Sequence, residues 1–300
     1  MKESIKREMA RDSILKSLFV PQTLGMEIYM IKKILPASIS RNITALTEEI
    51  RIRLGRQSII LYRDKEIVLP DIIDTDVFSD ILDKITEGSV YIFSESINNG
   101  FITIRGGHRV GLSGSAVVNN GKITAINDIS SFNIRVAHEI KGVGKRVFRD
   151  IVKEQIENTI IVSPPGCGKT TLLRDLTRLI SDNISGVRVS LIDERAEIAA
   201  SYSGIPQNDV GLRTDVFTGY SKNDGIMQAV RSMSPTVIVV DEIGTKEDFD
   251  SVLKANSSGV KVIATVHGND FKNIPNIFKY GIKLAKNNEF DRVEEILCLN

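Results

Sequence analysis

The sequence predicts a mixed α/β protein of two domains, the larger and C-terminal one built on a parallel sheet. The chain has 300 residues, which is long for one ordinary domain. Its C-terminal half repeats short β-branched runs, each fit for one buried strand, between segments of helical spacing. Its N-terminal half is strand-rich and broken by glycines. We expect an N-terminal extension at residues 1–34, a small α/β domain at 35–145 and the larger domain at 146–300.

Composition places the chain among soluble globular proteins, with 42% hydrophobic and 26% charged residues. The formal charge is only +1, so no overall field favours a nucleic-acid partner. No apolar run approaches the ~18 residues of a membrane-spanning helix, and the charged N-terminus lacks the apolar core of a signal peptide. Cys167 and Cys298 fit neither a disulfide framework nor a zinc site. We expect a cytoplasmic protein that can still dock on a membrane.

The extension at residues 1–34 is of mixed charge and partly amphipathic. It fits a loosely packed solvated helix better than a docking helix for a partner or membrane surface, which is the alternative. Four segments of the next domain have a regular pattern, the first three of strands and the last of a helix: 49–54, 58–62, 65–69 and 76–87. A second strand-rich block follows at residues 91–136.

The stretch from residue 101 to residue 150 is the most basic of the chain, with eight Lys or Arg against three acids. Nucleic-acid binding is one interpretation, although aromatic residues between the charges are few. Solvated strand edges protected by charge are another. Within it, residues 141–145 read Lys-Gly-Val-Gly-Lys, which predicts a flexible joint before a helix at 147–156.

A glycine-rich loop follows the first strand of the larger domain. Residues 163–171 read Ser-Pro-Pro-Gly-Cys-Gly-Lys-Thr-Thr between a β-branched run and a helical pattern. Backbone N–H groups and a helix N-terminus form a donor site for anionic oxygens there, unless the loop is an ordinary strand-to-helix turn. The full phosphate-loop pattern asks for glycine at Ser163, and serine is small enough to keep the turn. We expect the nucleotide to be bound by these residues: Pro165, Gly166, Cys167, Gly168, Lys169, Thr170 and Thr171.

The side-chain chemistry of this loop and of the strand ends that follow predicts a role for several residues. Lys169 would reach the β- and γ-phosphates, and Thr170 would offer its hydroxyl to Mg²⁺. Asp241 ends a buried strand and would hold Mg²⁺ through its waters, while Glu242 would orient or deprotonate the attacking water. A helix N-cap with a first-turn acid is the alternative for this acidic pair.

Two further strand ends bring polar residues to the same edge of the sheet. Asp193, Glu194 and Glu197 form a second acidic cluster, which includes a catalytic candidate in Glu194 unless Arg195 simply pairs with one of them. His267 could sense the γ-phosphate, although a lone histidine more often has a structural role.

Arginines are the remaining candidates for contact with phosphate. An arginine from a neighbouring subunit could stabilise charge on the γ-phosphate, and Arg109 or Arg135 suits that role. The long segment at residues 195–223 is functional or disordered, and its Arg213 is a further candidate.

The order of these motifs resembles the secretion ATPase superfamily and, within it, the stage III sporulation protein AA family. Four stretches carry the likeness to the Walker A motif, Asp box, Walker B motif and His box of that superfamily: 168–170, 193–197, 231–244 and 264–270. Residues 48–56 and 106–117 also resemble the N-terminal domain of that family. Asp241 departs from the pilus-type members, which often carry glycine there.

This resemblance implies a C-terminal RecA-like P-loop ATPase domain that uses ATP and Mg²⁺, with Glu242 as the catalytic glutamate and His267 in the His box. It further implies a hexamer in the mother cell, peripheral to the membrane, which serves a channel to the forespore. Two rival hypotheses are a nucleic-acid-dependent ATPase and a nucleotide-dependent scaffold that does not hydrolyse ATP.

Overall fold

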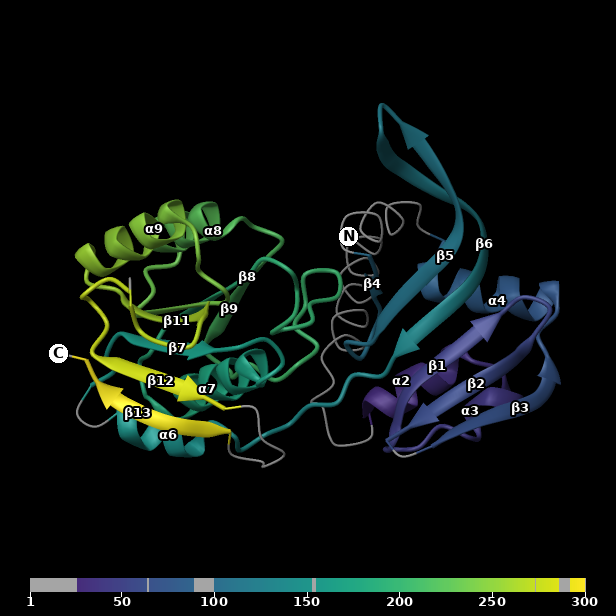
Figure 1. Cartoon of the computed structure of the whole chain (residues 1–300), viewed down its shortest axis with the longest axis horizontal. Helices are drawn as coiled ribbons and strands as arrows, with labels where there is room; N and C mark the ends of the chain where they lie inside the picture. Colours follow the sequence, from purple (N-terminus) through teal and green to yellow (C-terminus); the bar gives the residue numbers. More distant parts are fainter. Residues whose placement is uncertain are drawn as a thin grey trace, which may run out of the picture. The chain divides into compact units, whose positions relative to one another are not determined.

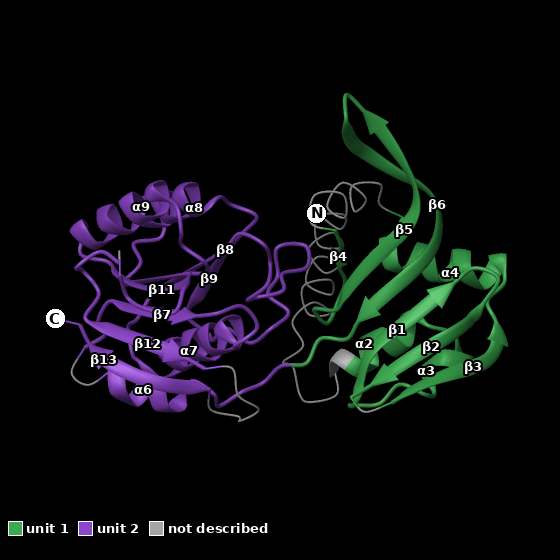
Figure 2. Ribbon diagram, in the orientation of Figure 1, with its two compact units in different colours: residues 1–138 green, residues 139–300 purple. Residues whose placement is uncertain are grey.

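The computed structural model describes residues 26–63, 65–88, 100–152, 155–272, 274–285 and 292–299. The chain divides into two compact units, residues 1–138 and residues 139–300 (Figures 1 and 2). Most of the predicted N-terminal extension, and residues 91–99 of the second strand-rich block, lie outside the described residues. Among the helices that are described, none is long and apolar enough to span a bilayer.

Unit 1 is a six-stranded antiparallel sheet in the order β3-β2-β1-β6-β5-β4. Its strands are β1 (Thr47–Arg53), β2 (Gln57–Tyr62), β3 (Glu66–Ile72), β4 (Ile102–Thr103), β5 (Arg109–Asn119) and β6 (Lys122–Arg135). Its described helices are α2 (Met26–Ile34), α3 (Ala37–Ser40) and α4 (Thr75–Thr86). The strands and the helix predicted between residues 49 and 87 are confirmed, with ends shifted by a few residues.

Alternation along β1 sets the two faces of this sheet. Ile50 and Ile52 are fully buried in a core shared with all three helices, where Phe78 of α4 stacks on Phe132 of β6 with ring centroids 4.2 Å apart. The residues between them, such as Arg51, point to the opposite face because successive strand side chains alternate. The helices therefore cover one face, and the other carries charged side chains.

The hairpin of β5 and β6 continues beyond the rest of the sheet (Figure 1). Its ladder runs out to a turn in which Asn120 has φ +51° and Gly121 has φ +75°, the left-handed values that a tight hairpin turn requires. We call residues 113–127 the β5–β6 ribbon. Val118 is 60% exposed and Ile123 is 51% exposed, and Lys122 is the only charged residue of the ribbon.

Unit 2 is built on a seven-stranded sheet in the order β13-β12-β7-β11-β10-β8-β9, parallel except for β13. Its strands are β7 (Thr159–Ser163), β8 (Val189–Asp193), β9 (Thr214–Thr218), β10 (Val237–Val240), β11 (Lys261–His267), β12 (Tyr280–Leu284) and β13 (Val293–Cys298). The predicted strands that end in Asp193, before Asp241 and at His267 are confirmed as β8, β10 and β11.

Helices cover both faces of this second sheet. α6 (Lys145–Ile151) and α7 (Lys169–Asn183) pack on one face, and α8 (Lys222–Ser232) and α9 (Lys246–Ser257) on the other, each with its own buried cluster (Figure 1). β7, β8, β10 and β11 run parallel, so their carboxyl ends meet at one edge. Ligands of open α/β sheets bind at that edge.

Candidate functional site

The glycine-rich loop at residues 163–171 joins β7 to α7. β7 ends at Ser163, and α7 begins at Lys169 with Gly168 as its N-cap. Gly166 has φ +77° and Gly168 has φ +86°, backbone conformations that favour glycine. The side chain of Cys167 is buried in the core and thereby anchors the loop to the domain. The strand–loop–helix geometry on which the binding prediction for residues 165–171 depends is therefore present.

Lys169 lies inside the loop rather than in solvent, with 8% of its surface exposed. Its Nζ donates to the carbonyl oxygen of Ser163 at 3.2 Å and lies 2.8 Å from His267 Nδ1. Because the ammonium group is only a donor, Nδ1 must accept, and the imidazole proton is assigned to Nε2. Burial lowers the pKa of Lys169, while the nearby carboxylates act in the opposite direction.

Asp241 stands immediately after β10, and two threonine hydroxyls donate to its carboxylate. Thr170 Oγ1 lies 3.4 Å from Oδ2, and the hydroxyl of Thr265 donates to Oδ1. Thr265 is fully buried in β11, and its Oγ1 also accepts the backbone N–H of Glu242 at 2.8 Å. One hydroxyl therefore positions both acids. Sequence reasoning missed it, since a threonine inside a buried strand carries no distinct signal.

Glu242 contacts an imidazole and a guanidinium group. Its Oε1 lies 3.2 Å from His267 Nε2, and its Oε2 lies 3.4 Å from Arg195 Nη1. It has φ +53°, a strained value for a residue with a side chain. α9 is capped instead by Thr245 through a capping box with Asp248. The alternative that the acidic pair caps a helix is therefore wrong.

Asp193 and Glu194 of the second acidic cluster have separate roles. Asp193 is 2% exposed, and its carboxylate accepts the backbone N–H groups of Glu197, Ile198 and Ala199. Burial raises the pKa of Asp193, and these hydrogen bonds oppose the rise. Asp193 therefore shapes the turn that follows β8. Glu194 forms an ion pair with Lys222 at the start of α8.

This cluster and the acidic pair after β10 share one small cavity of about 20 Å³, comparable to the space of one water molecule. Glu194 therefore lines the same cavity as the acidic pair. The cavity is lined by these residues: Asp193, Glu194, Arg195, Glu197, Lys222, Asp241 and Glu242.

The candidate arginines lie in different places. Arg109 and Arg135 face each other across the β5–β6 ladder of unit 1, where Arg135 Nε is 3.4 Å from a Glu49 oxygen. Their role toward a neighbouring subunit stays a prediction. Arg213 Nη1 donates to the carbonyl oxygen of Ser181 at 2.8 Å, near the end of α7. That end is about 18 Å from Lys169 at 1.5 Å per helical residue, so Arg213 does not contact the loop of its own chain.

A cavity of about 140 Å³ opens beside the loop. Its walls are mostly apolar: Ile140, Val143, Cys167, Gly168, Thr171, Leu172, Leu284, Arg292 and Val293. Arg292 Nη1 donates to the carbonyl oxygen of Gly166 at 3.1 Å. Sequence reasoning also missed Arg292, because it reaches the loop from more than a hundred residues away.

Oxygen donors suited to magnesium are present without a protein cage. Among the residues that the structure describes, no three His, Cys, Asp or Glu side chains are grouped to hold a metal. Thr170 Oγ1 and Asp241 Oδ2, 3.4 Å apart, are spaced close to the roughly 3 Å between adjacent ligands of an octahedral Mg²⁺. Mg²⁺ usually keeps waters and takes its remaining ligands from phosphates, so this donor set fits it.

Comparison with known proteins identifies relatives along most of the chain. The model of the family described as "Sporulation stage III, protein AA" matches residues 23–297. The stage III sporulation protein AA of Bacillus subtilis (strain 168) is 40% identical over 248 residues, which cover 79% of this chain and 81% of that protein.

Two solved structures share the fold at low sequence identity. The X-ray structure of the Legionella pneumophila ATPase DotB has a TM-score of 0.56 and 16% identity, and the match covers 94% of this chain and 83% of DotB. The pilus retraction motor PilT with bound ADP also has a TM-score of 0.56 and 16% identity, over 89% of this chain and 78% of PilT. These likenesses confirm the predicted α/β fold class, which the chain shares with DotB and PilT.

Proposed function

The chain belongs to the family of sporulation stage III protein AA, and from this membership and the geometry around Lys169 we propose that it hydrolyses ATP to ADP and phosphate. One observation carries the proposal. Side chains from the loop and from the ends of two further strands form two sets of direct contacts, which the hydroxyl of Thr265 links: Lys169 with His267 and Glu242, and Thr170 with Asp241. This combination would provide a phosphate anchor, a metal ligand and a base within one site.

The state of Lys169 supports phosphate binding. Its ammonium group donates to a carbonyl oxygen and to a neutral imidazole, both weaker acceptors than a charged phosphate oxygen. ATP would therefore draw Lys169 onto its β- and γ-phosphates, and the backbone N–H groups of residues 166–171 would donate to the phosphate oxygens. Phosphate charge would also offset the burial that lowers the pKa of Lys169.

Thr170 and Asp241 would hold the Mg²⁺ that accompanies ATP, and the metal would neutralise charge on the transferring phosphoryl group. Glu242 would accept a proton from the attacking water. His267 bridges Lys169 and Glu242. When Lys169 turns to the phosphates, His267 Nδ1 would lose this donor, and the imidazole would be free to contact the γ-phosphate.

The apolar cavity beside Gly168 would take the adenine base. Ligand pockets are mostly apolar with a few polar groups, and this one has aliphatic walls with the guanidinium of Arg292 at its rim. The cavity shares Gly168 and Thr171 with the loop, so a base and its phosphates would occupy continuous space.

We further propose that the chain acts as a homo-oligomer of six subunits in the cytoplasm of the mother cell. It would lie peripheral to the membrane and power assembly of, or transport through, a channel complex to the forespore. Family membership and the likeness to the PilT and DotB folds support a motor. Arg109 and Arg135, which face each other in the ladder of unit 1, would act toward the γ-phosphate bound by a neighbouring subunit.

ATP hydrolysis measured against protein concentration tests this proposal, because cooperative activation ties turnover to assembly. Lys169→Ala should abolish ATP binding, and Glu242→Gln should bind ATP but not hydrolyse it. Arg109→Ala or Arg135→Ala should spare binding and lower turnover only in assembled protein. Turnover that requires DNA or RNA would favour a nucleic-acid-dependent ATPase. ATP binding without turnover in an assembled wild type would favour a scaffold.

A further inference from the structure

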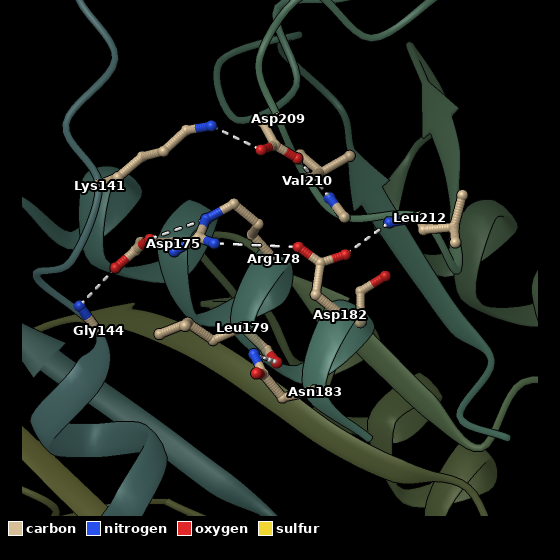
Figure 3. Close-up of polar contacts among 12 residues, drawn as sticks. Lys141, Gly144, Asp175, Arg178, Leu179, Asp182, Asn183, Asp209, Val210 and Leu212 are labelled. Atoms are coloured by element: carbon tan, nitrogen blue, oxygen red, sulfur yellow. Dashed lines mark hydrogen bonds and ion pairs between the residues drawn. The ribbon is translucent and has the colours of Figure 1, made fainter. Parts of the chain in front are cut away.

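The connector at residues 139–144 carries the chain into unit 2 before α6 begins, and it is anchored. The backbone N–H groups of Gly142 and Gly144 both donate to Asp175 Oδ2, each at 2.8 Å; Figure 3 shows the second of these. Gly144 is buried, and a Cβ at that position would lie 3.1 Å from the backbone nitrogen of Leu176. The prediction of a flexible joint is therefore wrong for these residues, which lie directly against α7.

Asp175 is the centre of this contact. Its side chain is 1% exposed, and its second oxygen accepts from Arg178 Nη2 at 2.6 Å and from Nε at 3.1 Å (Figure 3). A buried carboxylate is tolerated when it is paired and fully hydrogen-bonded, and here four N–H donors satisfy it. Removing its charge would leave the two connector N–H groups competing with Arg178 for the remaining oxygen.

The beginning of the connector is anchored as well. Glu139 accepts the backbone N–H of Asp209 at 2.8 Å, and Lys141 lies 2.6 Å from the Asp209 carboxylate. Just before it, His138 Nε2 lies 2.8 Å from the carbonyl oxygen of Thr47, inside unit 1. Each unit therefore holds its own end of the chain up to the His138–Glu139 boundary.

α7 connects these anchors to the candidate site. The helix starts at Lys169, and Asp175 follows six residues later, about 9 Å along the axis. On another flank, Asp182 Oδ1 accepts the backbone N–H of Leu212 at 3.0 Å, so α7 also holds the loop that contains Asp209 (Figure 3). A packed helix tied to the connector at its middle moves together with it.

We propose that Asp175 is a positioning residue that ties the connector to the helix carrying the phosphate loop. Binding of nucleotide at residues 163–171 thereby alters the hydrogen bonding of Gly142 and Gly144, and bending between the units is confined to the His138–Glu139 boundary. The coupling between bound nucleotide and the connector rests on the proposed nucleotide binding. The anchoring of the connector to Asp175 does not depend on it.

Amide hydrogen exchange on the full chain tests the anchoring without nucleotide. Asp175→Asn should speed exchange at Gly142 and Gly144 by about 10- to 100-fold, while amides of β7 stay protected. Asp182→Asn is the matched control, because it makes the same change on the same helix and should speed exchange at Leu212 but not at Gly142. If Asp175→Asn unfolds the protein, Gly144→Ala displaces the connector without a charge change and should speed exchange at Gly142. Unchanged exchange in a folded variant overturns the proposal.

Exchange with ADP or ATP and Mg²⁺ tests the coupling. Nucleotide should change exchange at residues 139–144 in the wild type, and Asp175→Asn should bind nucleotide yet lose that response. In steady-state kinetics it should lower kcat about 3- to 10-fold with KM within twofold, and Asp175→Glu should restore part of kcat. An equal response in wild type and variant, or none in a nucleotide-bound wild type, overturns the coupling. A wild type that binds no nucleotide refutes the proposed function instead, and the experiment without nucleotide still decides the anchoring.

Discussion

Thr265→Val removes one hydroxyl from the fully buried strand β11 while keeping the shape of the side chain. That hydroxyl donates to Asp241 and accepts the N–H of Glu242. The first bond has a charged partner and is worth about 1.5–3 kcal/mol, and the second about 0.5–1.5 kcal/mol. Because Val leaves no cavity, we expect a total loss of about 2–4.5 kcal/mol in the free energy of unfolding, measured by urea denaturation.

The same change should lower kcat by about 10- to 100-fold, since both acids lose their common support, while the KM for ATP should change little. Thr265→Ser is the matched control. It keeps the hydroxyl and removes one methyl group, at a cost of about 1 kcal/mol. If the Val and Ser variants have equal kcat and equal stability, the hydroxyl does not position the acidic pair and this reading of the site is wrong.

Two further predictions concern the ion pairs of Glu157 and the contact of Arg292 with the phosphate loop. Glu157 is held by Lys261 at 2.8 Å and Lys279 at 3.0 Å, and the hydrogen bond from Lys261 is the main cause that lowers its pKa to about 2. An acid whose pKa is lower in the folded protein stabilises the fold at pH values above its unfolded pKa, near 4.3, and this stabilisation is lost as the pH falls toward 2. Glu157→Gln should therefore lower the free energy of unfolding by about 1–2 kcal/mol at pH 7, after allowance for solvent screening, and by almost nothing near pH 2. Equal losses at both pH values in urea titrations would contradict this. Arg292→Ala should weaken ATP binding about tenfold in a fluorescent-nucleotide titration, because one charged hydrogen bond to the carbonyl oxygen of Gly166 disappears; an unchanged Kd would exclude Arg292 from the site.

Local patterns predicted the parts of the site that are close in sequence. The loop at residues 163–171 follows a buried strand and opens a helix, so its glycines and lysine could be placed without knowledge of the rest of the chain. The ends of β8, β10 and β11 were predictable for the same reason. Their meeting at one edge followed from parallel pairing.

Contacts between distant residues could not be predicted in this way. Asp175 reads as one polar residue in an amphipathic helix, and its acceptance of two connector N–H groups depends on how that helix packs. The same holds for Arg292, which reaches the loop from the strand pair at the far edge of the sheet. Asp193 was predicted to belong to the second acidic cluster because it ends a strand, whereas its burial directs its carboxylate to backbone N–H groups. β9, β12 and β13 were not predicted either.

The β5–β6 ribbon has a consequence for the behaviour of the protein in solution. Its residues lie beyond the pairing of β5 with β4 and of β6 with β1, so both outer edges carry backbone groups without a ladder partner among the described strands. Exposed Val118 and Ile123, with Lys122 as the sole charge, do little to discourage edge-to-edge aggregation. If ribbons of different molecules pair in this way, the turbidity of the solution would rise with protein concentration, over the same range in which assembly raises turnover. Val118→Lys should suppress the turbidity and leave turnover per subunit intact, which makes it the cleaner background for assembly experiments.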